Sequence, residues 1–187
     1  MEAFLISTLA VAVSEIGDKT QLVALMLAAR FQRPVPIIVG ILVATLTNHT
    51  LAALAGEWVR TALPAEYLRW GLGLSFLAVA VWALVPDRVD PRAKDVGRYG
   101  VFVASAAAFF MAEMGDKTQV ATAMLAAKYG ALIPVVGGTT VGMLLADVPA
   151  VLLGKVTAQK IPLQAVRYAA AAIFALLGIG VLAGRFI

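Results

Sequence analysis

The chain alternates between long apolar segments and short connections rich in proline, glycine and charge. Each apolar segment is near or above the roughly 20 residues that a helix needs to cross a bilayer. There are six of them, at residues 3–29, 34–59, 66–85, 99–127, 132–154 and 164–186. This pattern predicts an all-α integral membrane protein with six transmembrane helices.

An internal repeat divides these segments into two sets of three. Ser14–Gln21 (SEIGDKTQ) returns 98 positions later as Ala112–Gln119 (AEMGDKTQ), and the same offset aligns further residues of the two halves. An odd number of crossings per unit places the second unit upside down relative to the first. The sequence therefore predicts two inverted three-helix repeats, over residues 1–85 and 99–187, joined by a cytoplasmic linker at 86–98.

Composition agrees with a membrane protein and excludes a soluble domain. Hydrophobic residues make up 61% of the 187 positions and charged residues 14%, and the mean hydropathy is +0.91. The basic residues fall mostly at segment ends, which favours a topology signal and the lipid bilayer over a nucleic-acid partner. The chain has no cysteine, so thiolate metal ligands are excluded.

Loop charge predicts the orientation. The first, third and fifth connections and their flanks hold nine Lys and Arg residues, whereas the opposite side holds four. The richer side is expected in the cytoplasm, which leaves both termini outside.

The repeated motif contains acidic residues that fall close to the middle of the membrane. A charged side chain at the bilayer centre costs about 2.5 kcal/mol or more, so such residues mark functional sites. Glu15 and Asp18 are three positions apart and are expected on one helix face, as are Glu113 and Asp116. The sequence predicts four carboxylates around one ion.

Other motif residues extend this predicted site. Neutral oxygens are supplied by Thr20, Gln21, Thr118 and Gln119. An all-oxygen set suits Mg²⁺, Ca²⁺ or Mn²⁺. Lys19 and Lys117 follow the glutamates by four positions and are expected to pair with them, which leaves a formal charge of −2 for four carboxylates and two lysines. A divalent cation or two protons balance that charge equally, which is the basis of exchange.

The second helix of each repeat adds candidates for an ion or proton path. Asp147 lies inside the fifth segment. At the offset of 98 residues, Asn48 of the first repeat corresponds to Ala146 of the second, and His49 corresponds to Asp147. The alternatives are that Asp147 pairs with a basic group and that His49 bonds to Thr45 or to a carbonyl. For the motif as a whole, the alternative is a set of ion pairs that hold helices together.

Two copies of E-x-G-D-[KR]-[ST], at Glu15–Thr20 and Glu113–Thr118, resemble the signature of the cation/proton exchanger family known as uncharacterised protein family sixteen. This family includes bacterial manganese exporters and Golgi manganese and calcium transporters. The resemblance covers essentially the whole chain. It implies a cation site at Glu15, Asp18, Glu113 and Asp116, with Thr20, Gln21, Thr118 and Gln119 beside them, and the compact length resembles the bacterial members.

The sequence as a whole predicts a multi-pass secondary transporter of a bacterial inner membrane. We expect it to export Mn²⁺, with Ca²⁺ as the second choice, in exchange for protons, without a resident cofactor and without an enzymatic reaction. The oligomeric state, a homo-oligomer included, is left open. One alternative is an intramembrane enzyme acting on lipid phosphates. Such a site needs arginines or a phosphate-binding loop beside the carboxylates, whereas every arginine of this chain lies at a segment end. The other is an exporter of amino acids or other small cations.

Overall fold

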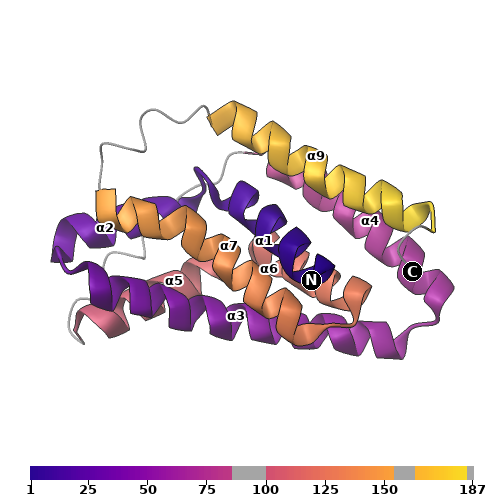
Figure 1. The fold of residues 1–187 in the computed structure, drawn as a ribbon, viewed down its shortest axis with the longest axis horizontal. Coiled ribbons are helices and arrows are strands. Elements are labelled where there is room, and N and C mark those ends of the chain that lie inside the picture. The colour runs from indigo at the N-terminus through magenta and orange to yellow at the C-terminus, as the bar shows by residue number, and fades with distance from the viewer. Residues whose placement is uncertain (86–99, 154–162, 185–187) are drawn as a thin grey trace.

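The computed structural model describes residues 1–85, 100–153 and 163–184, which form α-helices and no strand. The helices are α1 (Glu2–Glu15), α2 (Lys19–Phe31), α3 (Pro34–Ala62), α4 (Ala65–Ala83), α5 (Val101–Glu113), α6 (Lys117–Tyr129), α7 (Leu132–Leu153) and α9 (Leu163–Leu182). Most of them run roughly along the long axis of the molecule (Figure 1). The predicted linker at 86–98 lies outside the described residues.

Two of the six apolar segments are not single helices, which corrects the sequence-based prediction. The first consists of α1 and α2, and the fourth of α5 and α6, each interrupted at the repeated motif. Each glutamate is the last residue of one helix and each aspartate precedes the next, so the expectation that they share a face of one helix is wrong.

The break has a local cause that is the same in both repeats. Gly17 and Gly115 have φ angles of +79° and +75°, a left-handed conformation that glycine adopts readily. The next residue then begins a new helix, because Asp18 Oδ1 accepts the backbone N–H of Lys19 at 2.7 Å and Asp116 Oδ1 accepts that of Lys117 at 2.7 Å. Aspartate is among the preferred residues at a helix N-cap.

The two halves pack against each other through a contact that occurs twice. Helix α1 crosses α7, and the repeat-equivalent helices α5 and α3 cross in turn. A Cβ on Gly138 would lie 2.4 Å from the carbonyl oxygen of Phe4, and a Cβ on Gly40 would lie 2.9 Å from that of Phe102. Gly40 and Gly138 are 98 positions apart, as are Phe4 and Phe102. Glycine therefore permits the same close crossing in both places.

Helices α4 and α9 form a pair at one side of this core (Figure 1). Their backbones approach closely, since a Cβ on Gly178 would lie 2.9 Å from the carbonyl oxygen of Gly73. The repeat-equivalent Phe76 and Phe174 are both fully buried in the core cluster beneath them.

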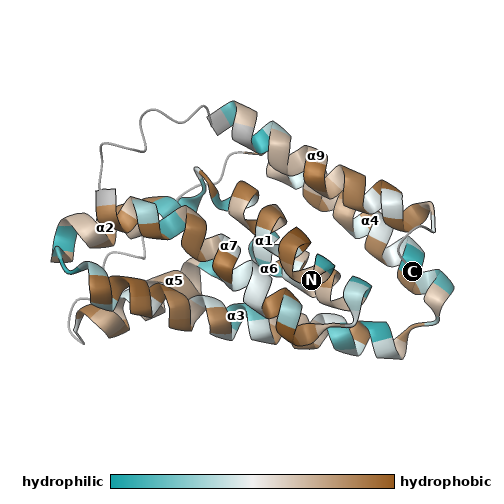
Figure 2. Ribbon diagram, in the orientation of Figure 1, coloured by the Kyte–Doolittle hydropathy of each residue, from teal (hydrophilic) through white to brown (hydrophobic). Residues whose placement is uncertain are grey.

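The molecule is apolar outside and charged inside. Large apolar side chains such as Trp58, Ile133 and Leu176 are 71%, 81% and 69% exposed, and Figure 2 shows apolar residues along the outer helices. By length and composition, α3 and α7 are able to cross a membrane, and α5 and residues 167–182 of α9 are shorter apolar helices. An exposed apolar surface of this kind is suited to lipid.

The glycine crossings give a test of the fold. We expect Gly40→Ala and Gly138→Ala each to lower the melting temperature of the protein in detergent by several degrees, because overpacking costs about 1–3 kcal/mol. Gly71→Ala is the matched control, since a Cβ there meets nothing within 4 Å. Equal melting temperatures for the three variants would contradict these close crossings.

Candidate cation site

Three of the four predicted carboxylates converge in the interior. One oxygen each of Glu15, Glu113 and Asp116 lies within 4.8 Å of the others. Glu15 and Glu113 are fully buried and Asp116 is 1% exposed. Oxygens bound to one cation at 2.0–2.6 Å lie at most about 5 Å apart, so these three are close enough to share a divalent ion.

Each glutamate has one oxygen held by a hydroxyl and one oxygen without a partner. Thr20 donates to Glu15 Oε2 at 2.6 Å, and Thr118 donates to Glu113 Oε2 at 3.0 Å. The two Oε1 atoms are buried and accept no hydrogen bond from any described residue. Leaving a buried acceptor unsatisfied costs about 1–3 kcal/mol of free energy. A bound cation or a proton at each Oε1 atom would remove this cost.

The two glutamines hold the helix breaks. Gln21 Oε1 accepts the N–H of Gly17 at 3.0 Å, and Gln119 Oε1 accepts that of Gly115 at 2.8 Å. Gln21 also donates from Nε2 to the carbonyl oxygen of Ala146 at 3.1 Å, which ties the first motif to α7.

The lysines form ion pairs between the repeats, which corrects the expectation that they pair with their own glutamates. Lys117 Nζ lies 3.0 Å from Asp18 Oδ2, and Lys19 Nζ lies 3.4 Å from Asp116 Oδ2. The physical reason is the helix break, because each lysine now lies in the first turn of a second helix and extends toward the motif of the other half.

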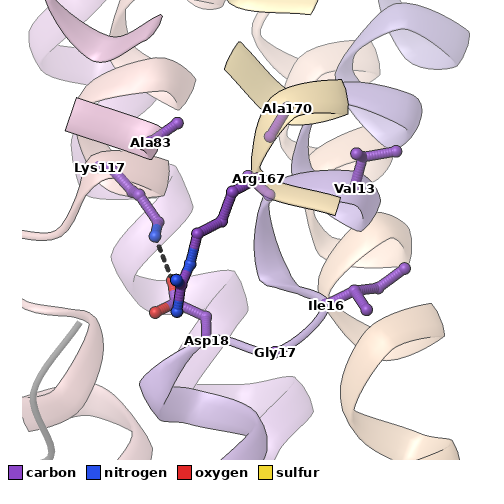
Figure 3. Close-up of a pocket in the computed structure, with 9 residues that line it drawn as sticks. Val13, Ile16, Gly17, Asp18, Ala83, Lys117, Arg167 and Ala170 are labelled. Atoms are coloured by element: carbon purple, nitrogen blue, oxygen red, sulfur yellow. Dashed lines mark ion pairs between the residues drawn. The ribbon is translucent and has the colours of Figure 1, made fainter. Parts of the chain in front are cut away.

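Asp18 lies beside this group in a small pocket that also contains a residue missed by sequence reasoning. Lys117 and Arg167 line the pocket with Asp18, and Figure 3 shows the Arg167 guanidinium directed toward the Asp18 carboxylate. The sequence analysis counted Arg167 among the nine basic residues of the cytoplasmic connections and their flanks, not among the site residues. The signal that pointed to it is its repeat-equivalent, Arg69, 98 positions earlier.

The three candidates on the second helices are all fully buried. His49 Nε2 lies 4.0 Å from Glu113 Oε2, and Asn48 donates to the carbonyl oxygen of Phe110 at 3.1 Å. Neither carboxylate oxygen of Asp147 has a hydrogen-bond partner among the described residues. Asp147 is close enough to Glu15 and to Asp18 for their charges to interact.

The arrangement is chemically suited to a hard divalent cation. The buried group contains five carboxylates, of Glu15, Asp18, Glu113, Asp116 and Asp147. Three basic groups lie beside two of them: Lys19 pairs with Asp116, Lys117 pairs with Asp18, and Arg167 lines the pocket at Asp18. With neutral His49 the cluster has a formal charge of −2. The donors are oxygens. Oxygen ligands bind the hard cations Mn²⁺, Ca²⁺ and Mg²⁺ in preference to soft metals, which favour sulfur ligands.

Comparison with known proteins agrees with this chemistry. The family model described as "Divalent cation/proton antiporter GDT1" matches residues 3–91 and 101–186. A protein of Vibrio cholerae serotype O1 named "Putative manganese exporter" is 51% identical over 180 residues, which cover 96% of this chain and 90% of that protein. A "GDT1-like protein" of Synechocystis is 33% identical over 182 residues, covering 86% and 87%. No solved structure matches.

These matches confirm the family predicted from the paired motifs, and with it a transporter rather than an enzyme. The lipid-phosphate enzyme is thereby excluded. The chain belongs to the GDT1 family of divalent cation/proton antiporters.

Proposed function

We propose that the protein exports Mn²⁺ from the cytoplasm in exchange for protons, with Ca²⁺ as the second candidate cargo. The observation that carries this proposal is the convergence of Glu15, Glu113 and Asp116 from both repeats, with oxygens within 4.8 Å of one another. Because the site needs both motifs, a cation bound there contacts both halves of the protein. Binding can therefore change how the halves pack.

The preference for Mn²⁺ is supported by the donor set and by one relative. Mg²⁺ gives up its water reluctantly, which disfavours it in an enclosed protein site. Mn²⁺ and Ca²⁺ both accept carboxylate oxygens. The Vibrio relative is named as a putative manganese exporter and is 51% identical to this chain, which favours Mn²⁺ over Ca²⁺ as the cargo.

We further propose six membrane crossings in two inverted repeats, with the motifs near the midplane. α1 and α2 have 14 and 13 residues and are each too short to span alone, but in tandem they are long enough. The start of α1 and the end of α9 lie at the same end of the molecule (Figure 1), as an even number of crossings requires. Discontinuous helices that meet at a midplane ion site recur in secondary transporters.

Exchange follows from the charge of the site. Leaving a formal charge of −2 in a low-dielectric interior is costly, so the cation leaves only when another positive charge replaces it. Burial and neighbouring like charges favour the protonated form of a carboxylate, which makes protons the available replacement. Mn²⁺ and protons thus compete for the same oxygens, in agreement with the antiporter family.

Of the predictions that test transport, the first concerns the two central glutamates. We expect Glu15→Gln and Glu113→Gln each to abolish Mn²⁺ transport in proteoliposomes, because an amide oxygen carries no charge to bind the cation or to exchange it for a proton. The exposed Glu66 gives the control Glu66→Gln, which we expect to transport normally. Gel filtration and melting temperature in detergent establish that each variant folds.

Near-normal transport by both glutamate variants would remove them from the site. Loss of folded protein in both would favour the alternative that these charges hold the helices together.

The second prediction concerns protons. We expect Mn²⁺ added to the purified protein in weak buffer near neutral pH to acidify the solution, because the cation displaces protons from the carboxylates. For the same reason the apparent affinity for Mn²⁺ should weaken as the pH falls. A pH electrode and binding titrations at several pH values measure both effects. Binding without proton release, together with flux that ignores a pH gradient, would indicate a uniporter or channel.

The third prediction concerns topology. The natural chain has no cysteine, so single cysteines report accessibility directly. We expect Asp90→Cys, in the linker, to react with an impermeant thiol reagent only from the cytoplasmic side, and Ala65→Cys, at the start of α4, only from the outside. Reversed labelling of the two positions in intact cells would refute the assigned orientation.

A further inference from the structure

A chain of hydrogen bonds joins α1 and α6 at the helix ends that lie farthest from the cation site. Lys128 Nζ donates to the Tyr129 hydroxyl at 2.9 Å, and that hydroxyl donates to Glu2 Oε1 at 3.3 Å. The ammonium also lies 4.3 Å from the centre of the Tyr129 ring. Lys128 is 8% exposed, which is uncommon for a lysine at a helix end. Packing therefore holds the lysine in place beside the tyrosine.

Both helices have their other end in the cation site. Helix α1 ends at Glu15, and α6 begins at Lys117, directly after Asp116. The two helices pack against each other, although they belong to opposite repeats (Figure 1). In the orientation proposed above, the ends at Glu2 and Tyr129 face the outside. An opening of the site toward the outside between α1 and α6 has to break the chain of hydrogen bonds.

The opposite ends of the molecule cannot form the same chain, because the second copy of these positions has other residue types. At the offset of 98 residues, the three positions correspond to Gly100, Arg30 and Phe31. The Arg30 guanidinium carbon lies 5.3 Å from the centre of the Phe31 ring, so the cation–aromatic pair is shared by both repeats. A phenylalanine has no hydroxyl and a glycine has no carboxylate. The two membrane faces therefore differ in composition, whatever other contacts Arg30 makes.

The pocket beside the site lies toward the face that we propose is cytoplasmic. It is lined by Asp18 and Lys117 and also by Ala83, the last residue of α4. Helix α4 starts at the connection that we propose is outside and ends where the chain continues into the linker. In this structure the space next to the first motif is thus on the linker side, and the hydrogen-bonded chain joins the helices on the other side.

Resting on the exchange function and the orientation proposed above, we propose that Glu2, Lys128 and Tyr129 form an outer latch. They are positioning residues that hold the outer ends of α1 and α6 together while the cation enters from the cytoplasm. The latch separates when the cation leaves toward the outside. It acts on the cation only through the two helices, since none of its residues lies in the site.

Tyr129 is the central member of the outer latch. Its hydroxyl is both a donor and an acceptor, so one atom links an ammonium to a carboxylate. Hydrogen bonds with an ionised partner are stronger than those between neutral groups, and those in a chain strengthen one another. Glu2 is exposed, so water can replace its hydrogen bond when the helices separate. The latch is therefore specific in its closed state and able to open.

Two reporter cysteines on the cysteine-free chain distinguish the two ends. Ala10 of α1 is fully buried in the core cluster that contains Ala121 and Leu125 of α6. Its repeat-equivalent on α5, Ala108, is 2% exposed and packs in the cluster that contains Ala24 of α2. Ala10→Cys therefore reports opening at the latched end, and Ala108→Cys reports opening at the other end. A hydrophilic thiol reagent measures both rates in detergent without Mn²⁺.

We expect Tyr129→Phe to raise the labelling rate of Ala10→Cys about fivefold and to leave that of Ala108→Cys unchanged. Glu2→Gln should raise the first rate by less, because the amide oxygen still accepts a hydrogen bond but carries no charge. Tyr67→Phe is the matched control, since the Tyr67 side chain is 69% exposed on α4. Gel filtration of each variant establishes that it is folded.

A covalent bond in place of the latch tests its role in transport. In the double variant Glu2→Cys with Tyr129→Cys, we expect a short bis-methanethiosulfonate reagent to join the two residues and to arrest Mn²⁺ flux in proteoliposomes. A reducing agent cleaves the bond and should restore the flux. The control is Glu57→Cys with Arg60→Cys, because a cross-link between these paired residues lies within α3 and leaves the helices free to separate.

Four results would overturn the outer latch. They are equal labelling of Ala10→Cys with Tyr129→Phe and with Tyr67→Phe, an equal rise at Ala10→Cys and Ala108→Cys, a 2–129 pair that does not cross-link, or a 2–129 cross-link that leaves the flux unchanged. Labelling in detergent depends neither on the cargo nor on the orientation. A selective rise at Ala10→Cys together with absent Mn²⁺ flux in the unmodified protein would therefore reject the proposed cargo while supporting the latch.

Discussion

The burial of five carboxylates in the interior of a helical protein with an apolar surface is the constraint on which the rest of the structure depends. Like charges at this density repel one another and lose the hydration that water would supply. The fold meets the constraint with charges from both halves, since Lys117 pairs with Asp18 and Lys19 with Asp116. Each of these aspartates pairs with a lysine of the other half, so the compensation of charge also joins the two halves.

The broken helices are the geometric reason why each lysine pairs with the aspartate of the other repeat. In a continuous helix, each lysine would lie one turn beyond its own glutamate and would pair with it. The left-handed glycine and the aspartate cap instead start a new helix at the lysine, which directs the side chain across the interface. The same break leaves Glu15 and Glu113 at helix ends, where each has one oxygen bound by a threonine and one oxygen available. Local backbone geometry and the chemistry of the site thus have one origin.

The sequence predicted the features that depend on periodicity and repetition. The helices α3, α4, α7 and α9 fall within a few residues of their predicted segments. The break at Ile16–Asp18 was not predicted, because its residues fit a helix as well as a break and only the φ angle of Gly17 decides between them. The ion pairs of Lys19 and Lys117 and the position of Arg167 depend on which helices meet, which one-dimensional spacing does not contain.

In the exchange mechanism that we propose, the two repeats pack in two alternative arrangements, and residues that differ between the halves make these arrangements unequal in energy. Asp147 lies where the first repeat has His49, and Ala146 lies where it has Asn48. Asn48 and Gln21 each reach the other half, to the carbonyl oxygens of Phe110 and Ala146, through side chains that are not equivalent. We infer that these differences set which packing is more populated at rest, whereas the direction of net transport follows from the gradients of the exchanged ions. Substitutions at His49 or Asp147 should therefore change how long the protein spends in each packing without reversing the exchange.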